Sequence, residues 1–102
     1  KIEQISIPPR PDEFRLVYHL YIVFAKDRDS LLQYCIDKGI EVKIHYPVPI
    51  YRQPALQYLR HEQGDFPVTD AHTEKIITFP CDQHLEQLQL DYIIRTVSEY
   101  YA

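Results

Sequence analysis

The 102-residue sequence lacks most of the patterns that mark common classes of enzyme and ligand-binding protein. Its two glycines, Gly39 and Gly64, are too few for a glycine-rich phosphate loop, and no G-x-S-x-G nucleophile motif occurs. No apolar run is long enough to span a membrane. The formal net charge of −4 provides no basic stripe to neutralise phosphates, so nucleic-acid binding is not expected. The remaining composition, 45% hydrophobic and 25% charged, is typical of one small globular domain.

Cysteine and histidine are not spaced for a metal site. The five histidines and the two cysteines, Cys35 and Cys81, show none of the intervals typical of zinc ligands. Two cysteines could form one disulfide, but Cys35 falls on the apolar face of an expected helix, which favours a buried free thiol. A free thiol is typical of a reducing compartment, and we expect no signal peptide. The sequence therefore predicts a cytoplasmic protein without a bound metal.

Hydrophobic patterning predicts three strands. Residues 16–25 are largely aromatic and β-branched, residues 41–45 alternate, and residues 76–79 form a short run that Pro80 stops. Helices are expected before Gly39, from Pro54, from Pro67 and along a clear apolar repeat near the end: Leu90, Ile93, Ile94, Val97 and Tyr101. This order predicts the α+β class, with a small three-stranded, mainly antiparallel sheet and helices packed on one face.

The first fifteen residues differ from the rest of the chain. Residues 1–15 contain Pro8, Pro9 and Pro11 and are expected to be a linker or the remnant of an inter-domain segment. Residues 16–102 are expected to form the domain. A chain that begins with a linker and ends with a helix is expected to be the C-terminal part of a longer protein.

The most restrained polar segment is His45-Tyr46-Pro47-Val48-Pro49. Proline fixes φ and favours extended geometry in the preceding residue, so His45 and Tyr46 are held where a strand is expected to end. They are candidates for ligand contact, although His45 could equally be a polar residue that closes a strand. Arg52 could bind an anionic substrate or be a solvated surface residue. His19, within the first expected strand, is interpreted as a packed core residue.

Several short motifs follow one another along the chain: Tyr18-His19-Leu20-Tyr21, Arg28-Asp29-x-Leu31, Lys38-Gly39-Ile40, His45-Tyr46-Pro47-Val48-Pro49, Gln53-Pro54-Ala55, Gly64-Asp65-Phe66-Pro67 and Phe79-Pro80. Together and in this order they resemble the C-terminal small domain of the DegT-type nucleotide-sugar aminotransferases. The resemblance extends from about residue 17 to the end. Each motif alone is weak, and the ordered series is specific.

The resemblance implies a fold type I enzyme that depends on pyridoxal phosphate. In such enzymes a large N-terminal domain carries the cofactor and its Schiff-base lysine, the protein is a homodimer, and an amino group passes from glutamate to a nucleotide-linked keto sugar. The small domain closes one side of the cleft, so His45 and Tyr46 are the expected substrate-binding residues, with Arg52 a third. Many relatives have histidine at the position of Tyr51, so the resemblance does not predict that this chain makes the contact of that histidine.

No catalytic residue is expected in this chain, because none of its lysines lies in the lysine motif of the family. The chain is therefore expected to be inactive when isolated, as part of an enzyme of polysaccharide or natural-product biosynthesis. Two alternatives stay open. One is a free-standing α+β module that binds a ligand or a partner, and the other is the small domain of a non-catalytic regulatory relative.

Overall fold

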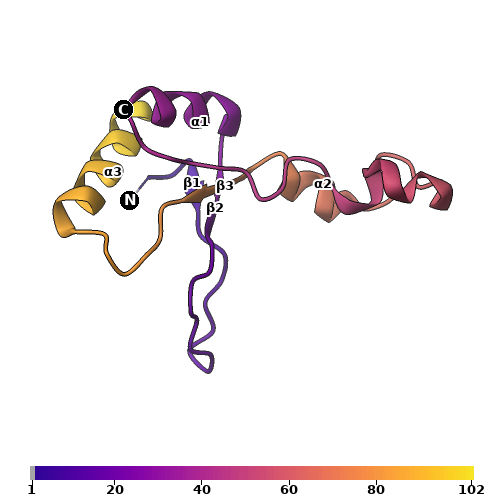
Figure 1. Cartoon of the computed structure of the whole chain (residues 1–102), viewed down its shortest axis with the longest axis horizontal. Coiled ribbons are helices and arrows are strands. Elements are labelled where there is room, and N and C mark those ends of the chain that lie inside the picture. The colour runs from indigo at the N-terminus through magenta and orange to yellow at the C-terminus, as the bar shows by residue number, and fades with distance from the viewer. Residues whose placement is uncertain (1) are drawn as a thin grey trace.

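A three-stranded antiparallel sheet organises the molecule, whose computed structural model describes residues 2–102. Its strands are β1 (Ile5–Ser6), β2 (Tyr21–Ala25) and β3 (Ile76–Phe79), with β2 in the middle (Figure 1). The register pairs Val23 with Ile77. The predicted α+β class with an antiparallel sheet is thus confirmed.

Two of the predicted strands differ from the structure. The strand expected at residues 16–25 begins only at Tyr21, because β3 offers four partners and the next residue, Pro80, has no N–H to continue the ladder. The prediction of a strand at residues 41–45 is wrong. Within this segment only Lys43 pairs with the sheet, through an isolated bridge to Thr78. Apolar and alternating patterns show where a strand can form, but not how many partners it finds.

The third strand of the sheet is β1, which lies within residues 1–15, the segment expected to be a linker. Ile5 pairs with Ala25 and Ser6 with Phe24. Two paired residues followed by a proline-rich stretch give too short a pattern to be distinguished from a linker by sequence. At least this part of residues 1–15 belongs to the sheet.

Helix α1 (Arg28–Asp37) ends as its sequence predicts. Gly39 has a φ of 77°, its N–H donates to the Ile36 carbonyl at 2.9 Å, and the Ile40 N–H donates to the Cys35 carbonyl at 2.9 Å. This is a Schellman motif, in which glycine takes the left-handed conformation at low cost. No side-chain cap forms at the start of α1, because Asp27 has a left-handed φ of 52° instead of the extended backbone of a capping residue.

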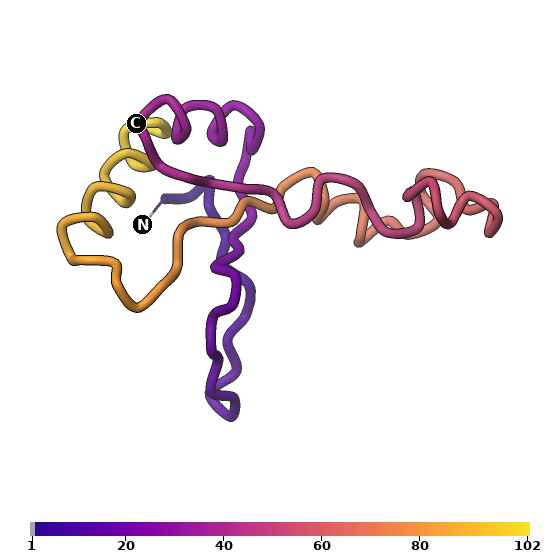
Figure 2. Tube along the Cα trace, viewed as in Figure 1, coloured from indigo at the N-terminus to yellow at the C-terminus, as the bar shows by residue number. Residues whose placement is uncertain are grey.

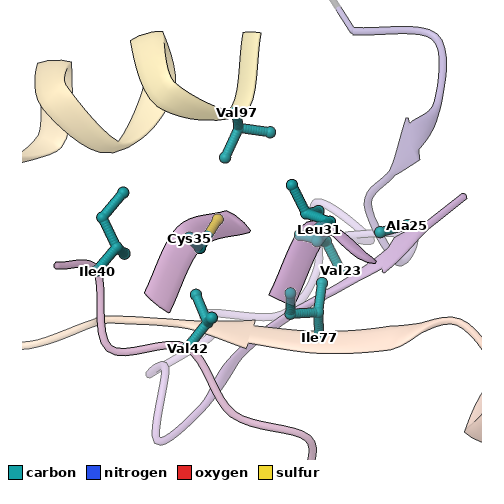
Figure 3. Packing of buried hydrophobic residues seen from close by; sticks show 8 residues of the cluster. All are labelled: Val23, Ala25, Leu31, Cys35, Ile40, Val42, Ile77 and Val97. Carbon is teal, nitrogen blue, oxygen red and sulfur yellow. The ribbon is translucent and has the colours of Figure 1, made fainter. Parts of the chain in front are cut away.

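The core lies between one face of the sheet and helices α1 and α3 (Gln87–Tyr100), as Figure 3 shows. Alternation along β2 sends Val23 and Ala25 to the same face. The buried apolar cluster consists of Val23, Ala25, Leu31, Cys35, Ile40, Val42, Ile77 and Val97. Cys35 is a free, fully buried cysteine, as predicted, and burial raises the pKa of its thiol.

Two segments extend away from this core (Figure 2). One is a hairpin of residues 7–20, and the other is an arm of residues 46–73 that contains η1 (Ile50–Arg52), η2 (Pro54–Leu59) and α2 (Pro67–Thr73). They explain a radius of gyration of 15.6 Å, compared with roughly 13 Å for a compact domain of this length. Helices η2 and α2 start at the predicted prolines. Helix α2 lies in the arm (Figure 1), and its His72 ring packs against Phe24 of β2 with centroids 4.6 Å apart. No helix in residues 2–102 has the length and apolar character to cross a membrane.

Candidate functional site

The restrained histidine segment runs along the outer edge of β3. Val42 is buried in the core, so strand alternation places Lys43 and His45 on the opposite side, away from α1 and α3. Two backbone hydrogen bonds fix this position: the Lys43 N–H donates to the Thr78 carbonyl at 3.1 Å, and the Thr78 N–H donates to the Lys43 carbonyl at 2.8 Å. His45 thus lies on the sheet face opposite α1 and α3.

His45 lines a cavity of about 250 Å³. The other lining residues come from the hairpin, the segment before His45, and the end of β3 with its following loop: His19, Leu20, Glu41, Lys43, Thr78, Phe79, Pro80, Cys81 and Asp82. The His45 Nδ1 lies 2.9 Å from the Thr78 Oγ1, and the His45 ring meets the Tyr46 ring edge-on, with their centroids 5.5 Å apart. The peptide bond between His45 and Tyr46 is cis.

The three predicted substrate residues do not gather at one place. His45 is half-buried in the cavity wall, whereas the Tyr46 side chain is 69% exposed beside it and is not among the lining residues. Arg52 is exposed in η1 of the arm and does not line the cavity. The structure therefore brings His45 and Tyr46 together and leaves Arg52 on a separate element.

Tyr51, at the position where relatives were expected to have histidine, lies in η1 of the arm. It is buried, and its hydroxyl donates to the Asp70 Oδ1 at 2.5 Å, while the Asp70 Oδ2 accepts the Gly64 N–H at 2.9 Å. The hydrogen bond to Asp70 raises the pKa of Tyr51, and desolvation of the hydroxyl also raises it, to a smaller extent. Phe66 packs against the Tyr51 ring with centroids 4.8 Å apart. These contacts connect the two ends of the arm.

The charged side chains of the cavity wall each have a polar partner nearby. The Lys43 Nζ lies 2.6 Å from the Glu41 Oε1, and this hydrogen bond and charge lower the pKa of Glu41. The Asp82 Oδ1 accepts the His84 N–H at 2.6 Å. With one lysine against two carboxylates, the lining has no surplus of positive charge. Such a wall suits the hydroxyl and carbonyl groups of a sugar better than a diphosphate.

Among the cavity residues that the sequence did not point to, His19 and Thr78 have polar side chains suited to ligand or histidine contacts. His19 was expected in the core, but β2 begins after it, so it is exposed and lines the cavity with His45. Thr78 is buried with 6% exposure and was counted only as part of a strand. The hydroxyl of Thr78 in the otherwise apolar segment 76–79 was the signal that could have identified it. A buried polar side chain requires a hydrogen-bond partner, here His45.

A larger cavity, of about 470 Å³, lies elsewhere in residues 2–102. It is bounded by the sheet and α3, and most of its lining side chains are apolar, among them Ile5, Val23, Ile93 and Val97. Few polar groups converge there, so it lacks the hydrogen-bonding groups that orient a sugar. Among residues 2–102, no three potential metal ligands lie close enough to bind an ion.

The described residues do not fit pyridoxal phosphate. A Schiff-base lysine has to lie in a protected cavity, and Lys26, Lys38, Lys43 and Lys75 are all exposed in residues 2–102. Lys43 alone of the four lines the cavity of His45, and it is paired with Glu41. No step that involves this cofactor is assigned to the chain.

Comparison with known proteins places the chain in a family. The model of the DegT/DnrJ/EryC1/StrS aminotransferase family matches residues 1–98. The chain belongs to this family. The resemblance inferred from its ordered motifs is thereby confirmed. DegT-family aminotransferases depend, as a class, on pyridoxal phosphate.

Two curated relatives and one solved structure illustrate the similarity. The erythromycin biosynthesis sensory transduction protein EryC1 of Saccharopolyspora erythraea is 31% identical over 93 residues, which are 91% of this chain and 25% of EryC1. The dTDP-3-amino-3,6-dideoxy-α-D-galactopyranose transaminase of Aneurinibacillus thermoaerophilus is 26% identical over 94% of this chain and 26% of its own length. The crystal structure of DesV from S. venezuelae superposes with a TM-score of 0.92 at 28% identity, covering 98% of this chain and 27% of DesV. The chain thus spans about a quarter of the relatives that it matches.

Proposed function

We propose that this chain is the small domain of a sugar aminotransferase that moves an amino group from glutamate to a nucleotide-linked keto sugar. The observation that carries the proposal is the family match over residues 1–98, together with a relative named as a dTDP-amino-sugar transaminase. Pyridoxal phosphate would supply the amino-transfer chemistry in the whole protein, held by residues outside the described chain. The isolated chain would be inactive, and the whole protein would be a cytoplasmic homodimer.

The proposed role of this chain is to position the sugar. His45 would contact it from the cavity wall, and the exposed Tyr46 ring would pack against it, while Arg52 would contribute less because it lies in the arm. Holding the reacting carbon of the sugar in place removes translational and rotational freedom before the reaction, which is how positioning accelerates it. The lack of surplus positive charge in the cavity supports a sugar, and not the diphosphate, at His45.

A His45→Ala variant of the full-length gene product tests this role. The assay runs in reverse, with dTDP-3-amino-3,6-dideoxy-α-D-galactopyranose and 2-oxoglutarate as probes. We expect kcat/KM for the amino sugar to fall at least about 10-fold, and kcat/KM for 2-oxoglutarate to change less than about twofold, because only the sugar contact is removed. His84→Ala, an exposed histidine outside the cavity, is the matched control. Unchanged kinetics with both substrates would contradict the assignment of His45.

The second candidate is a regulatory protein that keeps the fold without the reaction. One relative is named a sensory transduction protein, and this name supports the regulatory candidate. The absorbance spectrum of the full-length protein with pyridoxal phosphate separates the two. A cofactor band that changes on addition of glutamate supports the aminotransferase, whereas a spectrum identical to that of free cofactor supports the regulator. An intact gene product of about 12.2 kDa would instead indicate a free-standing module.

A further inference from the structure

Thr78 is the residue that fixes the His45 ring. It lies on β3, where its neighbour Ile77 faces the core, so alternation directs the Thr78 side chain to the opposite face, the face of His45. Its backbone is bonded twice to Lys43, two residues before His45. Its hydroxyl oxygen lies 2.9 Å from the His45 Nδ1. Backbone and side chain of one residue therefore hold the histidine segment together.

The burial of Thr78 determines the direction of this hydrogen bond. The residue is 6% exposed, and within residues 2–102 its hydroxyl has one hydrogen-bond partner, the His45 Nδ1. If Nδ1 carried the proton and donated it, the hydroxyl hydrogen would have no acceptor among residues 2–102, which is unfavourable for a residue that is almost fully buried. The hydroxyl therefore donates to an unprotonated Nδ1. In neutral imidazole the proton then resides on Nε2.

We propose that Thr78 is a positioning residue that holds His45 as the Nε2–H tautomer, so that His45 donates a hydrogen bond to an oxygen of the sugar. The inference rests on the proposed function for the identity of the ligand, while the tautomer itself rests on geometry alone. An Nε2–H group selects an acceptor, that is, a hydroxyl or keto oxygen. It does not select the protonated amino group of the product.

Kinetics of the full-length protein test whether Thr78 acts through His45. Thr78→Val removes the hydroxyl but keeps the size and β-branched shape, and Thr78→Ser keeps the hydroxyl. In the reverse assay with the dTDP amino sugar, we expect Thr78→Val to lower kcat/KM about 5- to 20-fold, with 2-oxoglutarate affected less than about twofold. Thr78→Ser should retain at least about half of the wild-type value. In a His45→Ala background, Thr78→Val should have less than about a twofold effect, because its partner is already gone.

A measurement without substrate tests the tautomer. In full-length protein labelled with ¹⁵N-histidine, the His45 signals are assigned by their loss in His45→Ala. We expect the proton on Nε2 and an unprotonated Nδ1, and a change of the Nδ1 shift in Thr78→Val that Thr78→Ser largely reverses. A proton on Nδ1 would overturn the inference, whatever the kinetics show.

The outcomes separate this inference from the proposed function. If His45→Ala leaves the sugar kinetics unchanged, the proposed function of His45 fails, and the NMR measurement still decides the tautomer. If His45→Ala is impaired and the loss from Thr78→Val is equally large in both backgrounds, Thr78 acts independently of His45 and the inference fails. A Thr78→Val variant that loses the 2-oxoglutarate activity as well has a general structural defect, and that result also counts against a positioning role.

Discussion

Replacement of Gly39 tests how the end of α1 is formed. Gly39 has a φ of 77°, and a Cβ added to it would meet nothing within 4 Å, so an alanine there has room but an unfavourable backbone. A left-handed conformation costs an L-residue about 1–2 kcal/mol. Alanine also restricts the unfolded chain, which returns about 0.4–1 kcal/mol. The net expectation for Gly39→Ala is a loss on the order of 1 kcal/mol in the free energy of unfolding.

Asparagine provides the matched control, because it enters the left-handed region more readily than alanine does. We expect Gly39→Asn to lose less than half as much stability as Gly39→Ala. Urea unfolding, with the same m-value for all three proteins, measures both differences, and a loss of about 1 kcal/mol should lower Tm by about 4–8 °C. An alanine variant as stable as the wild type, or an asparagine variant as unstable as the alanine variant, would refute the reasoning.

Two further predictions concern the core and the last turn of the chain. Leu31 is fully buried, so Leu31→Ala should lower the free energy of unfolding, measured with urea, by about 2–5 kcal/mol. The control Leu88→Ala, at a position that is 78% exposed, should lower it by less than about 0.5 kcal/mol. A loss below about 1 kcal/mol for Leu31→Ala would contradict the packing. The Tyr101 hydroxyl donates to the Lys26 carbonyl, and burial raises its pKa to about 12. The unfolded chain therefore loses this proton first, near pH 10, and stability should fall between about pH 10 and 12. Tyr101→Phe should weaken this fall in a series of Tm measurements against pH, and an unchanged slope would show that Tyr101 does not contribute.

Local signals in the sequence were sufficient to place several helix ends, although they did not indicate η1. Gly39 and the prolines at positions 54 and 67 set helix ends through their own backbone restrictions, so a reader of the sequence can place those ends without knowing the fold. The strands depend on partners that are distant in sequence. β2 begins at Tyr21 because Pro80 ends its neighbour, and β1 was hidden because two paired residues leave almost no pattern.

The same distinction applies to the candidate site. His45 and Tyr46 could be selected because the following prolines restrain them locally. His19 and Thr78 could not, because each reaches the cavity only through the folding of the sheet: His19 lies just before β2, and Thr78 lies across from Lys43. The separation of Arg52 from the cavity was equally invisible, since it depends on the course of the arm.

The interval between Gly39 and His45 has a physical explanation in this structure. The Schellman motif at Gly39 turns the chain so that Ile40 enters the core, and Val42 follows two residues later on the same side. Lys43 then meets Thr78 in the backbone bridge, and His45, again two residues on, reaches the Thr78 hydroxyl. An insertion or deletion of one residue in this interval would reverse the faces and send His45 toward the core. The spacing of the motif thus determines which face of the sheet carries the histidine, and with it the position of the proposed sugar contact.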